Sequence, residues 1–284
     1  MKKSAVILLL TLLSVSVGAE RHALIIGIGR YADVDNGWTT IHGDNDIHIA
    51  VNMLVANGFD KSNILTLQNE EATFVHISKA MEQLIENAHN KDLVYVHFSG
   101  HGQQITDLDG DEEDGFDEAW IPFDALPIPT TAYHGEHHIT DDRLNVWLTR
   151  LREKVGSEGR IIVVSDACHA GSATRDIKEI CEIRGIKAKF ILMDKPSPYM
   201  HTRSIEWVSI SACSDDECNR QCMTEEGIQC GSLTYALYLL RDSLKMLRPA
   251  ELEASLSEKI KALVSRSQTP KVEYGEKYAN HSVL

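Results

Sequence analysis

Short apolar runs alternate with amphipathic segments along most of this 284-residue chain. The runs are rich in β-branched residues and end in glycine or small polar residues, which is typical of strands buried on both faces of a parallel sheet. The amphipathic segments carry apolar residues three and four positions apart, which is typical of helices packed on such a sheet. The predicted strands cover residues 21–29, 63–67, 92–99, 161–164 and 207–213, and the predicted helices cover residues 43–57, 73–88, 140–155, 231–247 and 251–265. This alternation predicts an α/β fold with a mostly parallel sheet flanked by helices.

One long segment, residues 174–203, lacks this periodicity. It carries seven basic residues together with Pro196 and Pro198. Such a composition is typical of an exposed connector or a mobile loop. We predict that it interrupts a single domain that covers residues 20–284.

Two reactive side chains follow predicted strands. Cys168 comes shortly after the run at 161–164, and His101 stands between two glycines after the run at 92–99. Because parallel strands end at the same edge of a sheet, we expect the two side chains to lie near each other. A thiol needs a neighbouring base to act as a nucleophile. The alternative for Cys168 taken alone is a buried structural thiol.

The segments FSGHG and DACHAG, which contain these two residues, resemble the catalytic core of the caspase/metacaspase superfamily of cysteine peptidases, and bacterial metacaspases most of all. The similarity extends over residues 22–245, with Ala170 where the family usually has serine. It implies a caspase-like fold with a six-stranded sheet. It also implies an endopeptidase in which Cys168 attacks the substrate carbonyl, His101 protonates the leaving amine, and a thioester forms. The backbone N–H groups of Gly102 and Cys168 are expected to hold the oxyanion.

A carboxylate stands two positions before the nucleophile, where caspases carry glutamine. Asp166 and Cys168 share one side of the strand, and a buried carboxylate needs a cationic partner, such as a substrate Arg or Lys. The resemblance adds Asp46 and Ser99 to this substrate pocket. The alternative for Asp166 is a residue that caps the following turn. We predict cleavage after Arg or Lys.

An acidic segment, residues 107–118, follows the histidine motif. It differs from an EF-hand because Glu112 stands where that loop requires glycine, so a solvated charged loop is the alternative to a metal site. Some metacaspases bind calcium through acids of this region. The resemblance therefore implies Asp117, Asp141 and Asp142 as candidate Ca²⁺ ligands. No other cofactor is expected.

The first nineteen residues have the pattern of a secretory signal peptide. Lys2 and Lys3 precede an apolar stretch at 5–17 and a small-x-small cleavage site. We expect an exported protein, periplasmic or secreted, that does not insert into the membrane after cleavage. The net charge of −14 disfavours nucleic acid as a partner. Gly27 and Gly29 lack the third glycine of a dinucleotide fingerprint. We expect a monomer that acts on peptide or protein substrates with a basic residue before the scissile bond.

Six cysteines must be accommodated in an exported chain. Cys168 must stay reduced to react, and oxidising compartments favour disulfides among the others. We predict two bridges among Cys181, Cys218, Cys222 and Cys230, with Cys213 as a buried thiol. Zinc is the alternative, although no paired C-x-x-C spacing supports it.

Two hypotheses about activity remain. The first is a peptidase that cleaves its own connector, for which the candidate sites follow Arg175, Lys178, Arg184, Lys187 and Lys189. The second is a catalytically silent caspase-like binding module. The intact His101 and Cys168 favour the first.

Overall fold

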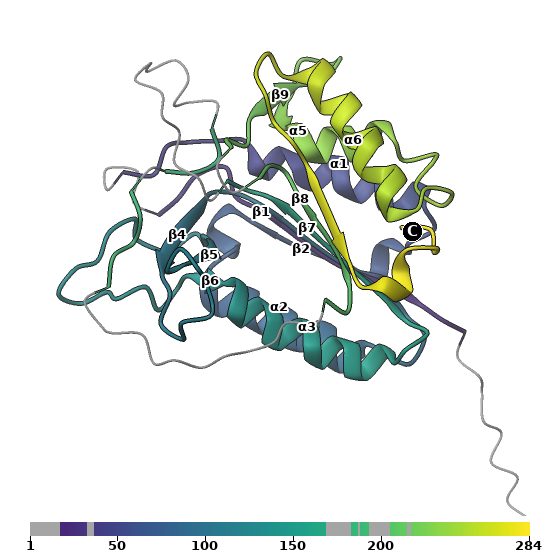
Figure 1. Ribbon diagram of the computed structural model, residues 1–284, viewed down its shortest axis with the longest axis horizontal. Helices are drawn as coiled ribbons and strands as arrows, with labels where there is room; N and C mark the ends of the chain where they lie inside the picture. Colours follow the sequence, from purple (N-terminus) through teal and green to yellow (C-terminus); the bar gives the residue numbers. More distant parts are fainter. Residues whose placement is uncertain (1–17, 33–36, 169–182, 187, 193–204, 215–216) are drawn as a thin grey trace, which may run out of the picture.

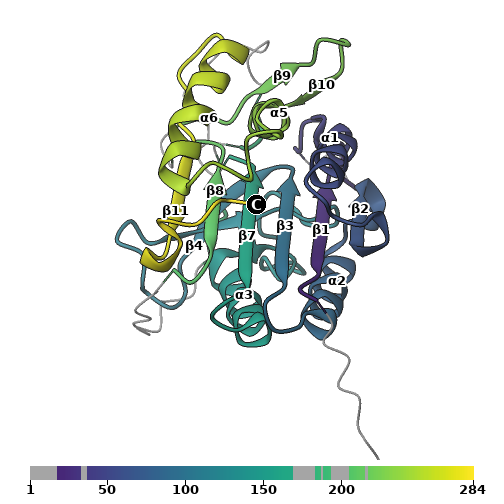
Figure 2. The same ribbon diagram turned by 90° about the vertical axis from the view of Figure 1, so that its right-hand side faces the viewer.

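A six-stranded sheet forms the middle layer of the computed structural model, which describes residues 18–32, 37–168, 183–186, 188–192, 205–214 and 217–284. The strands, in spatial order, are β11 (Lys271–Tyr274), β8 (Val208–Ser211), β7 (Arg160–Asp166), β3 (Leu93–Ser99), β1 (Arg21–Gly27) and β2 (Ile64–Gln68). Only β11 runs antiparallel to its neighbour (Figure 2). The predicted α/β fold with a six-stranded, mostly parallel sheet is confirmed.

Helices cover both faces of this sheet (Figure 1). Helices α2 (Phe74–Asn87) and α3 (Asp141–Val155) pack on one face, and α1 (Gly43–Ala56), α5 (Ser232–Leu239) and α6 (Pro249–Leu263) pack on the other. Successive residues of β1 alternate between the two hydrophobic cores, with Leu24 and Ile26 in one core and Ala23 and Ile25 in the other. Burial on both faces explains why the central strands are continuous apolar runs.

Helix α3 shows how the sequence sets the ends of a helix. The Thr140 side chain accepts a hydrogen bond from the Arg143 N–H, and Asp141 and Asp142 lie in the first turn. Both features stabilise the positive end of the helix dipole. The helix ends at Gly156, whose φ of 66° favours glycine.

Two smaller sheets lie outside the main one. Strands β4 (Gly102–Thr106), β5 (Phe116–Trp120) and β6 (Ile139–Thr140) form an antiparallel sheet beyond the carboxyl end of β3, and β9 (Gln221–Met223) and β10 (Gln229–Gly231) form a hairpin. The short 3-10 helices are η2 (Lys61–Asn63), η3 (Asn69–Glu71) and η4 (Glu276–Tyr278). No helix in the described part of the chain is long and apolar enough to cross a membrane.

The helix predicted to reach residue 247 was too long. It ends at Leu239, because the following residues form turns in which the Ser243 N–H donates to Leu240 and the Met246 N–H to Ser243, three residues apart instead of four. The connector at 174–203, predicted to be exposed, is partly buried where the structure describes it, since Arg184 and Phe190 are fully buried while Ala188, Lys189 and Ile191 are exposed. The signal peptide, apart from its last two residues, and the rest of the connector lie outside the described residues.

Candidate active site

The parallel pairing of β3 with β7 brings the two motifs together. Ser99, the last residue of β3, is directly opposite Asp166, the last residue of β7. His101 and Cys168 each follow two positions later at the same edge of the sheet. Between them in space, the Gly100 N–H donates to the Asp166 carbonyl at 3.4 Å. A Cβ at Gly100 would lie 2.8 Å from the Phe98 ring, so a larger residue does not fit there.

His101 is held in one orientation and is neutral at pH 7. Its ring lies 5.1 Å from the rings of both Tyr31 and Trp38, and its Nε2 lies 2.7 Å from the Thr39 carbonyl oxygen. Because a carbonyl only accepts, Nε2 carries the proton. Nδ1 has no hydrogen-bond partner within the described residues. Burial lowers the pKa of His101 to about 4. Nδ1 is therefore a free acceptor for a proton.

The Cys168 thiol is protonated in this arrangement. Its Sγ donates to the Glu217 carbonyl at 3.3 Å, and the Sγ of Cys213 donates to the same oxygen at 3.4 Å. A hydrogen bond with the Cys213 thiol, together with burial, raises the pKa of Cys168 to about 12. Since the thiolate is the reactive form of a cysteine, this contact disfavours the reactive form of Cys168.

Removing the second thiol should make Cys168 more acidic. In Cys213→Ala the largest cause of the raised pKa is gone, so Cys168 should ionise at lower pH. The pH dependence of its alkylation by iodoacetamide, followed on the Cys168 peptide by mass spectrometry, measures this. The midpoint should move to lower pH. An unchanged midpoint, matching that of a Cys222→Ala control, would contradict this assignment.

The expected oxyanion donors converge on one oxygen. The backbone N–H groups of Cys168 and Gly102 donate to the Arg184 carbonyl oxygen at 2.9 and 3.2 Å. Two such donors aimed at one point are what stabilises the oxygen of a tetrahedral intermediate. The structure therefore places a peptide carbonyl of its own chain where a substrate carbonyl is expected.

The side chain of the same residue fills the predicted substrate pocket. The Nη1 atom of Arg184 lies 2.6 Å from Asp46 Oδ2 and 3.5 Å from Asp166 Oδ1, and it also bonds the Ser99 hydroxyl. All four side chains are buried. Burial raises the pKa of Asp46 to about 6 against the lowering effect of Arg184, so Asp46 is ionised at pH 7. The pocket holds two carboxylates and one cation.

Three pocket residues were not predicted from the sequence. Asp166 accepts hydrogen bonds from Asn219 Nδ2 at 2.7 Å and from the N–H and hydroxyl of Thr234 at 2.8 and 2.6 Å. The Gly231 N–H donates to Asp46 at 2.9 Å, and a Cβ at Gly231 would clash with the Asp166 carboxylate. These residues lie beside the β9–β10 hairpin, where no periodic pattern marked their approach to the pocket. Asp166 is thus buried in a network of hydrogen bonds with residues distant in the sequence.

The chain around Arg184 crosses the site as an extended peptide. The Arg184 N–H donates to the Asn219 carbonyl at 3.2 Å, Ile183 forms an antiparallel bridge with Arg220, and Gly185 forms a parallel bridge with Gly102. A Cβ at Gly185 would clash with the Cys168 carbonyl. Extended main-chain pairing on a sheet edge is a common mode of peptide recognition. The Arg184–Gly185 bond lies at the reactive cysteine.

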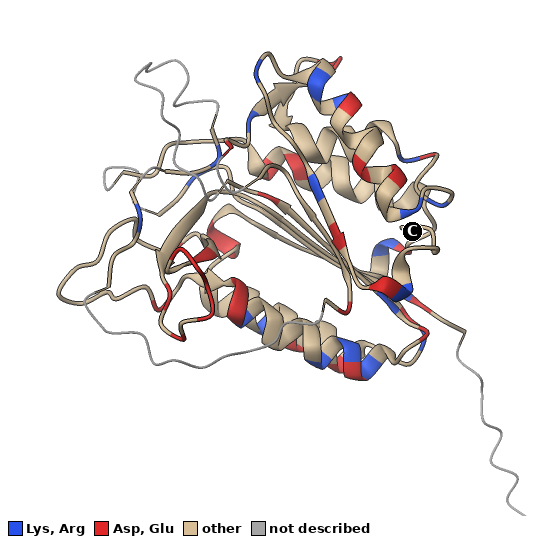
Figure 3. Ribbon diagram, in the orientation of Figure 1, with Lys and Arg blue, Asp and Glu red and all other residues tan. Residues whose placement is uncertain are grey.

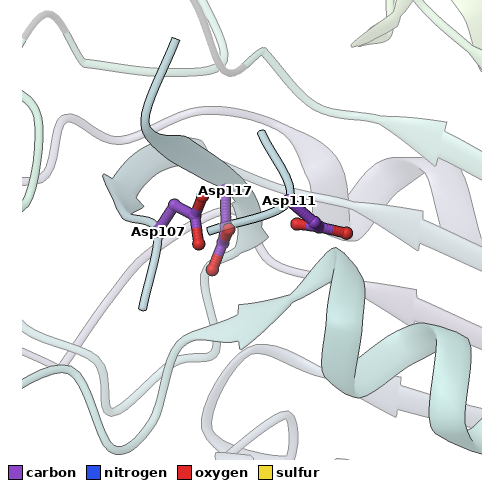
Figure 4. A group of neighbouring side chains, drawn as sticks. All are labelled: Asp107, Asp111 and Asp117. Carbon is purple, nitrogen blue, oxygen red and sulfur yellow. The ribbon is translucent and has the colours of Figure 1, made fainter. Parts of the chain in front are cut away.

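The acidic segment, together with Asp141 and Asp142, forms three carboxylate groups, two of which share Asp111; the segment is visible as the concentration of red beside β5 in Figure 3. In each group the ligand atoms lie within 4.8 Å of one another; the groups are Asp107, Asp111 and Asp117; Asp109, Asp111 and Asp142; and Glu112, Glu118 and Asp141. Figure 4 shows the first group. The three acids predicted from the sequence fall into three different groups, and the other five members were missed as ligands.

Among these acids, Asp117 gives the strongest indication that a cation binds here. It is 5% exposed, and its Oδ1 has no hydrogen-bond partner in the described part of the chain. Burial, followed by the charges of Asp141 and Asp142, raises its pKa to about 8. A buried carboxylate surrounded by other acids is stabilised when a cation binds there. The acidic groups could therefore hold a metal ion, and their oxygen-only donors suit Ca²⁺.

No disulfide joins the five cysteines that the structure describes, and the pairings predicted for Cys181 lie outside the described residues. The sulfurs of Cys222 and Cys230 lie 3.7 Å apart across the β9–β10 hairpin. Cys213 is a buried thiol, as predicted.

Comparison with solved structures identifies the fold. A protein of Geobacter sulfurreducens superposes with a TM-score of 0.62 at 19% identity, over 92% of this chain and 96% of that one. Caspase-1 from Spodoptera frugiperda superposes with a TM-score of 0.58 at 12% identity, over 90% of this chain and 89% of that one. The caspase-like fold is confirmed.

Comparison of sequences identifies the family. Metacaspase-1B of Aspergillus fumigatus is 34% identical over 178 residues, which make up 59% of this chain and 39% of that protein. Metacaspase-1 of Pyricularia oryzae is 31% identical over 161 residues, or 54% of this chain and 37% of that protein. The chain thus spans less than half the length of these curated relatives. The metacaspase, peptidase C14 domain matches residues 21–176. Because this match takes in more than half of its residues, the chain belongs to the metacaspase family.

Proposed function

We propose that the protein is a cysteine endopeptidase that cleaves after Arg, and less readily after Lys, using Cys168 and His101. One observation carries the proposal. The Arg184 carbonyl accepts from the N–H groups of Cys168 and Gly102 while its side chain neutralises the carboxylates of the pocket. The seated Arg184 thus engages both oxyanion donors through its carbonyl and both carboxylates through its Nη1 atom. Membership of the metacaspase family supports this chemistry.

The residues of the site suit each step of peptide hydrolysis. His101 Nδ1 accepts the thiol proton, and the Cys168 sulfur attacks the carbonyl carbon while the oxyanion is held by two backbone N–H groups. His101 then gives the proton to the leaving amine as the C–N bond breaks. Water hydrolyses the thioester, which releases the acid product and restores the thiol.

The charge of the pocket decides its specificity. Asp46 and Asp166 are fully buried, and burying an unpaired charge costs several kcal/mol. A guanidinium or ammonium group offsets that cost, whereas a substrate aspartate would add a third buried negative charge. Arg is favoured over Lys because its planar group offers more donors to two carboxylates.

Asp166→Asn should reduce cleavage of an arginyl amide substrate by about 10- to 100-fold in kcat/KM. This corresponds to the loss of one charge-assisted hydrogen bond, about 1.5–3 kcal/mol. Steady-state kinetics with arginyl, lysyl and aspartyl substrates measure it. Glu113→Gln, an exposed acid outside the metal groups, is the matched control and should leave kcat/KM unchanged.

A peptide-library profile with cleavage after Asp would contradict the proposed specificity. The competing hypothesis, a catalytically silent binding module, has a separate test. An arginyl acyloxymethyl ketone should label Cys168 covalently in Arg184→Ala, whose pocket is not filled by its own arginine, and more slowly in Arg184→Ala/Asp166→Asn at the same concentration. Absence of labelling in folded Arg184→Ala would favour the binding module.

We further propose that the Arg184–Gly185 bond is the enzyme's own first substrate. The sequence indicated five candidate sites in the connector, and Arg184 alone among those described is seated in the pocket. Lys189 is part-exposed and lies over the Phe116 ring instead. A bond on the same chain is present at high effective concentration. Until it is cut, this segment also excludes other substrates.

We propose Ca²⁺ as the ion of the acidic groups. Asp117 together with Asp107 and Asp111 would hold it, and its charge would neutralise the buried carboxylates of the loop that leads into β5. Strand β5 pairs with β4, which begins at the oxyanion donor Gly102. Neutralising this loop would therefore order the strand that carries one of the catalytic N–H groups.

Calcium should stabilise the uncut protein. In a Cys168→Ala background, Ca²⁺ at 100 times its Kd should add about 2.7 kcal/mol to the free energy of unfolding, seen as a rise of several degrees in Tm. Asp117→Asn should abolish most of the rise, and Glu113→Gln should keep it. An equal rise with Asp117→Asn, or a larger one with Mg²⁺, would contradict the assignment.

The protein is proposed to act outside the cytoplasm as a monomer on peptide or protein substrates. The support is the pattern of two lysines, an apolar stretch and a small-x-small site in the first nineteen residues. An acidic enzyme that cleaves after basic residues also attracts cationic substrates, since the chain carries a net charge of −14.

A further inference from the structure

We propose that Cys222 and Cys230 form a disulfide that fixes the wall of the arginine pocket. The bond itself follows from the geometry of the hairpin and holds whether or not the protein is a peptidase. Its effect on substrate binding rests on the proposed function. Neither cysteine belongs to the catalytic machinery described above.

The hairpin places the two cysteines directly opposite each other. Cys222 of β9 is the partner of Cys230 of β10 in the antiparallel ladder. The residue pairs two positions to either side are hydrogen-bonded, by Thr224 N–H to Ile228 and Ser232 N–H to Arg220, so the cysteine pair is also of the hydrogen-bonded kind. Such pairs have Cα atoms about 5.5 Å apart, in the middle of the range that disulfides span.

The thiols also point at each other. Their sulfurs are 3.7 Å apart, about 1.7 Å more than a disulfide bond, and rotation of the side chains must close that gap. Cys230 is fully buried and Cys222 is 8% exposed, in a small apolar cluster with Tyr235. This cluster shields most of the bond from solvent once it forms. An oxidant can reach the pair through the exposed part of Cys222.

The chemistry requires an external disulfide, either a small one such as oxidised glutathione or that of a thiol–disulfide oxidoreductase. The Cys222 thiolate attacks one of its sulfurs and releases the first thiol as a mixed disulfide forms. The Cys230 thiolate then attacks the Cys222 sulfur and displaces the second thiol. Two protein thiols are oxidised, one external disulfide is reduced to two thiols, and the two protons pass to those thiols.

The hairpin is tied to the pocket at both strands. Gly231, next to Cys230, donates its N–H to Asp46, and Gln221, next to Cys222, accepts from the N–H of His42 at 2.7 Å where α1 begins. Helix α1 carries Asp46. A covalent link between the two strands therefore holds both hydrogen bonds in register. Reduction should loosen the pocket and raise KM for arginyl substrates several-fold, with a smaller change in kcat.

A mass measurement tests the bond without any need for activity. Both cysteines lie on one tryptic peptide, residues 221–241. In the full-length Cys168→Ala protein, equilibrated with oxidised glutathione and then treated with iodoacetamide, this peptide should appear unalkylated and lighter by two hydrogen atoms. Dithiothreitol should restore alkylation of both thiols and lower Tm by roughly 5 °C. The variant Cys222→Val/Cys230→Val should show no dithiothreitol effect on Tm.

Two outcomes would overturn the inference. One is alkylation of both cysteines after equilibration with oxidised glutathione, and the other is a bond from either cysteine to a different one, such as Cys218. The effect on substrate binding is measured as the KM of the wild-type enzyme with and without the disulfide. An unchanged KM would show that the disulfide does not affect the pocket. If the bond forms and no arginyl substrate is cleaved, the proposed function fails and the disulfide stands.

Discussion

Full-length wild-type protein incubated with calcium should be converted into two fragments, the first ending at Arg184 and the second beginning at Gly185. Cys168→Ala should remain a single chain. The scissile carbonyl already accepts from both oxyanion donors, so no rearrangement of the peptide is needed before attack. Deprotonation of the thiol, whose pKa Cys213 raises, is one step that separates the resting arrangement from the reactive one.

The cleavage site is tested by replacing the residue in the pocket. Arg184→Lys should be cut slowly and Arg184→Gln should stay intact at that bond, as read by mass spectrometry of the fragments. The two fragments should remain associated without reducing agent or denaturant, because β8 of the second pairs with β7 of the first. Cleavage of Arg184→Gln at the wild-type rate, for example after Lys189, would show that the seated bond is not the substrate.

The positions of His101 and Cys168 at one edge of the sheet were predictable because each depends only on a short stretch of sequence. Each strand is an apolar run that ends in its own motif, and parallel pairing brings strand ends together whatever the sequence between them. Asp166 could likewise be assigned to the pocket from its position two residues before Cys168, because alternate strand residues share a face. None of these inferences depended on the position of the connector.

The occupant of the pocket was not predictable in this way. Arg184 stands in a segment rich in charged residues, and such residues are rarely buried, so an exposed connector was the better expectation from composition. Its burial depends on Asp46, 138 positions away, and on Asp166 across the sheet. The strands β4 to β6 and β9 to β11 were missed because two to five residues are too few to show a period.

Emptying the pocket should increase its affinity for an added ligand. In a Cys168→Ala background, Arg184→Ala should bind a benzoyl-arginine amide on the order of a hundredfold more tightly than the protein with its own arginine in place. A tethered segment competes at an effective concentration in the millimolar range, and that competition is what the substitution removes. Isothermal titration measures the two dissociation constants.

The same variant separates inhibition by the connector from a purely structural role of Arg184. Removing the guanidinium leaves two buried carboxylates without a cation, which should cost about 3–5 kcal/mol of stability and lower Tm. A pocket built for a basic side chain must recover that stability when the arginine amide binds, so Tm should rise with ligand in this variant and hardly at all in the parent. Arg184→Lys is the matched control, since its ammonium should preserve both Tm and the block. Equal affinities in parent and variant would mean that Arg184 supports the fold without blocking the binding of ligands to the pocket.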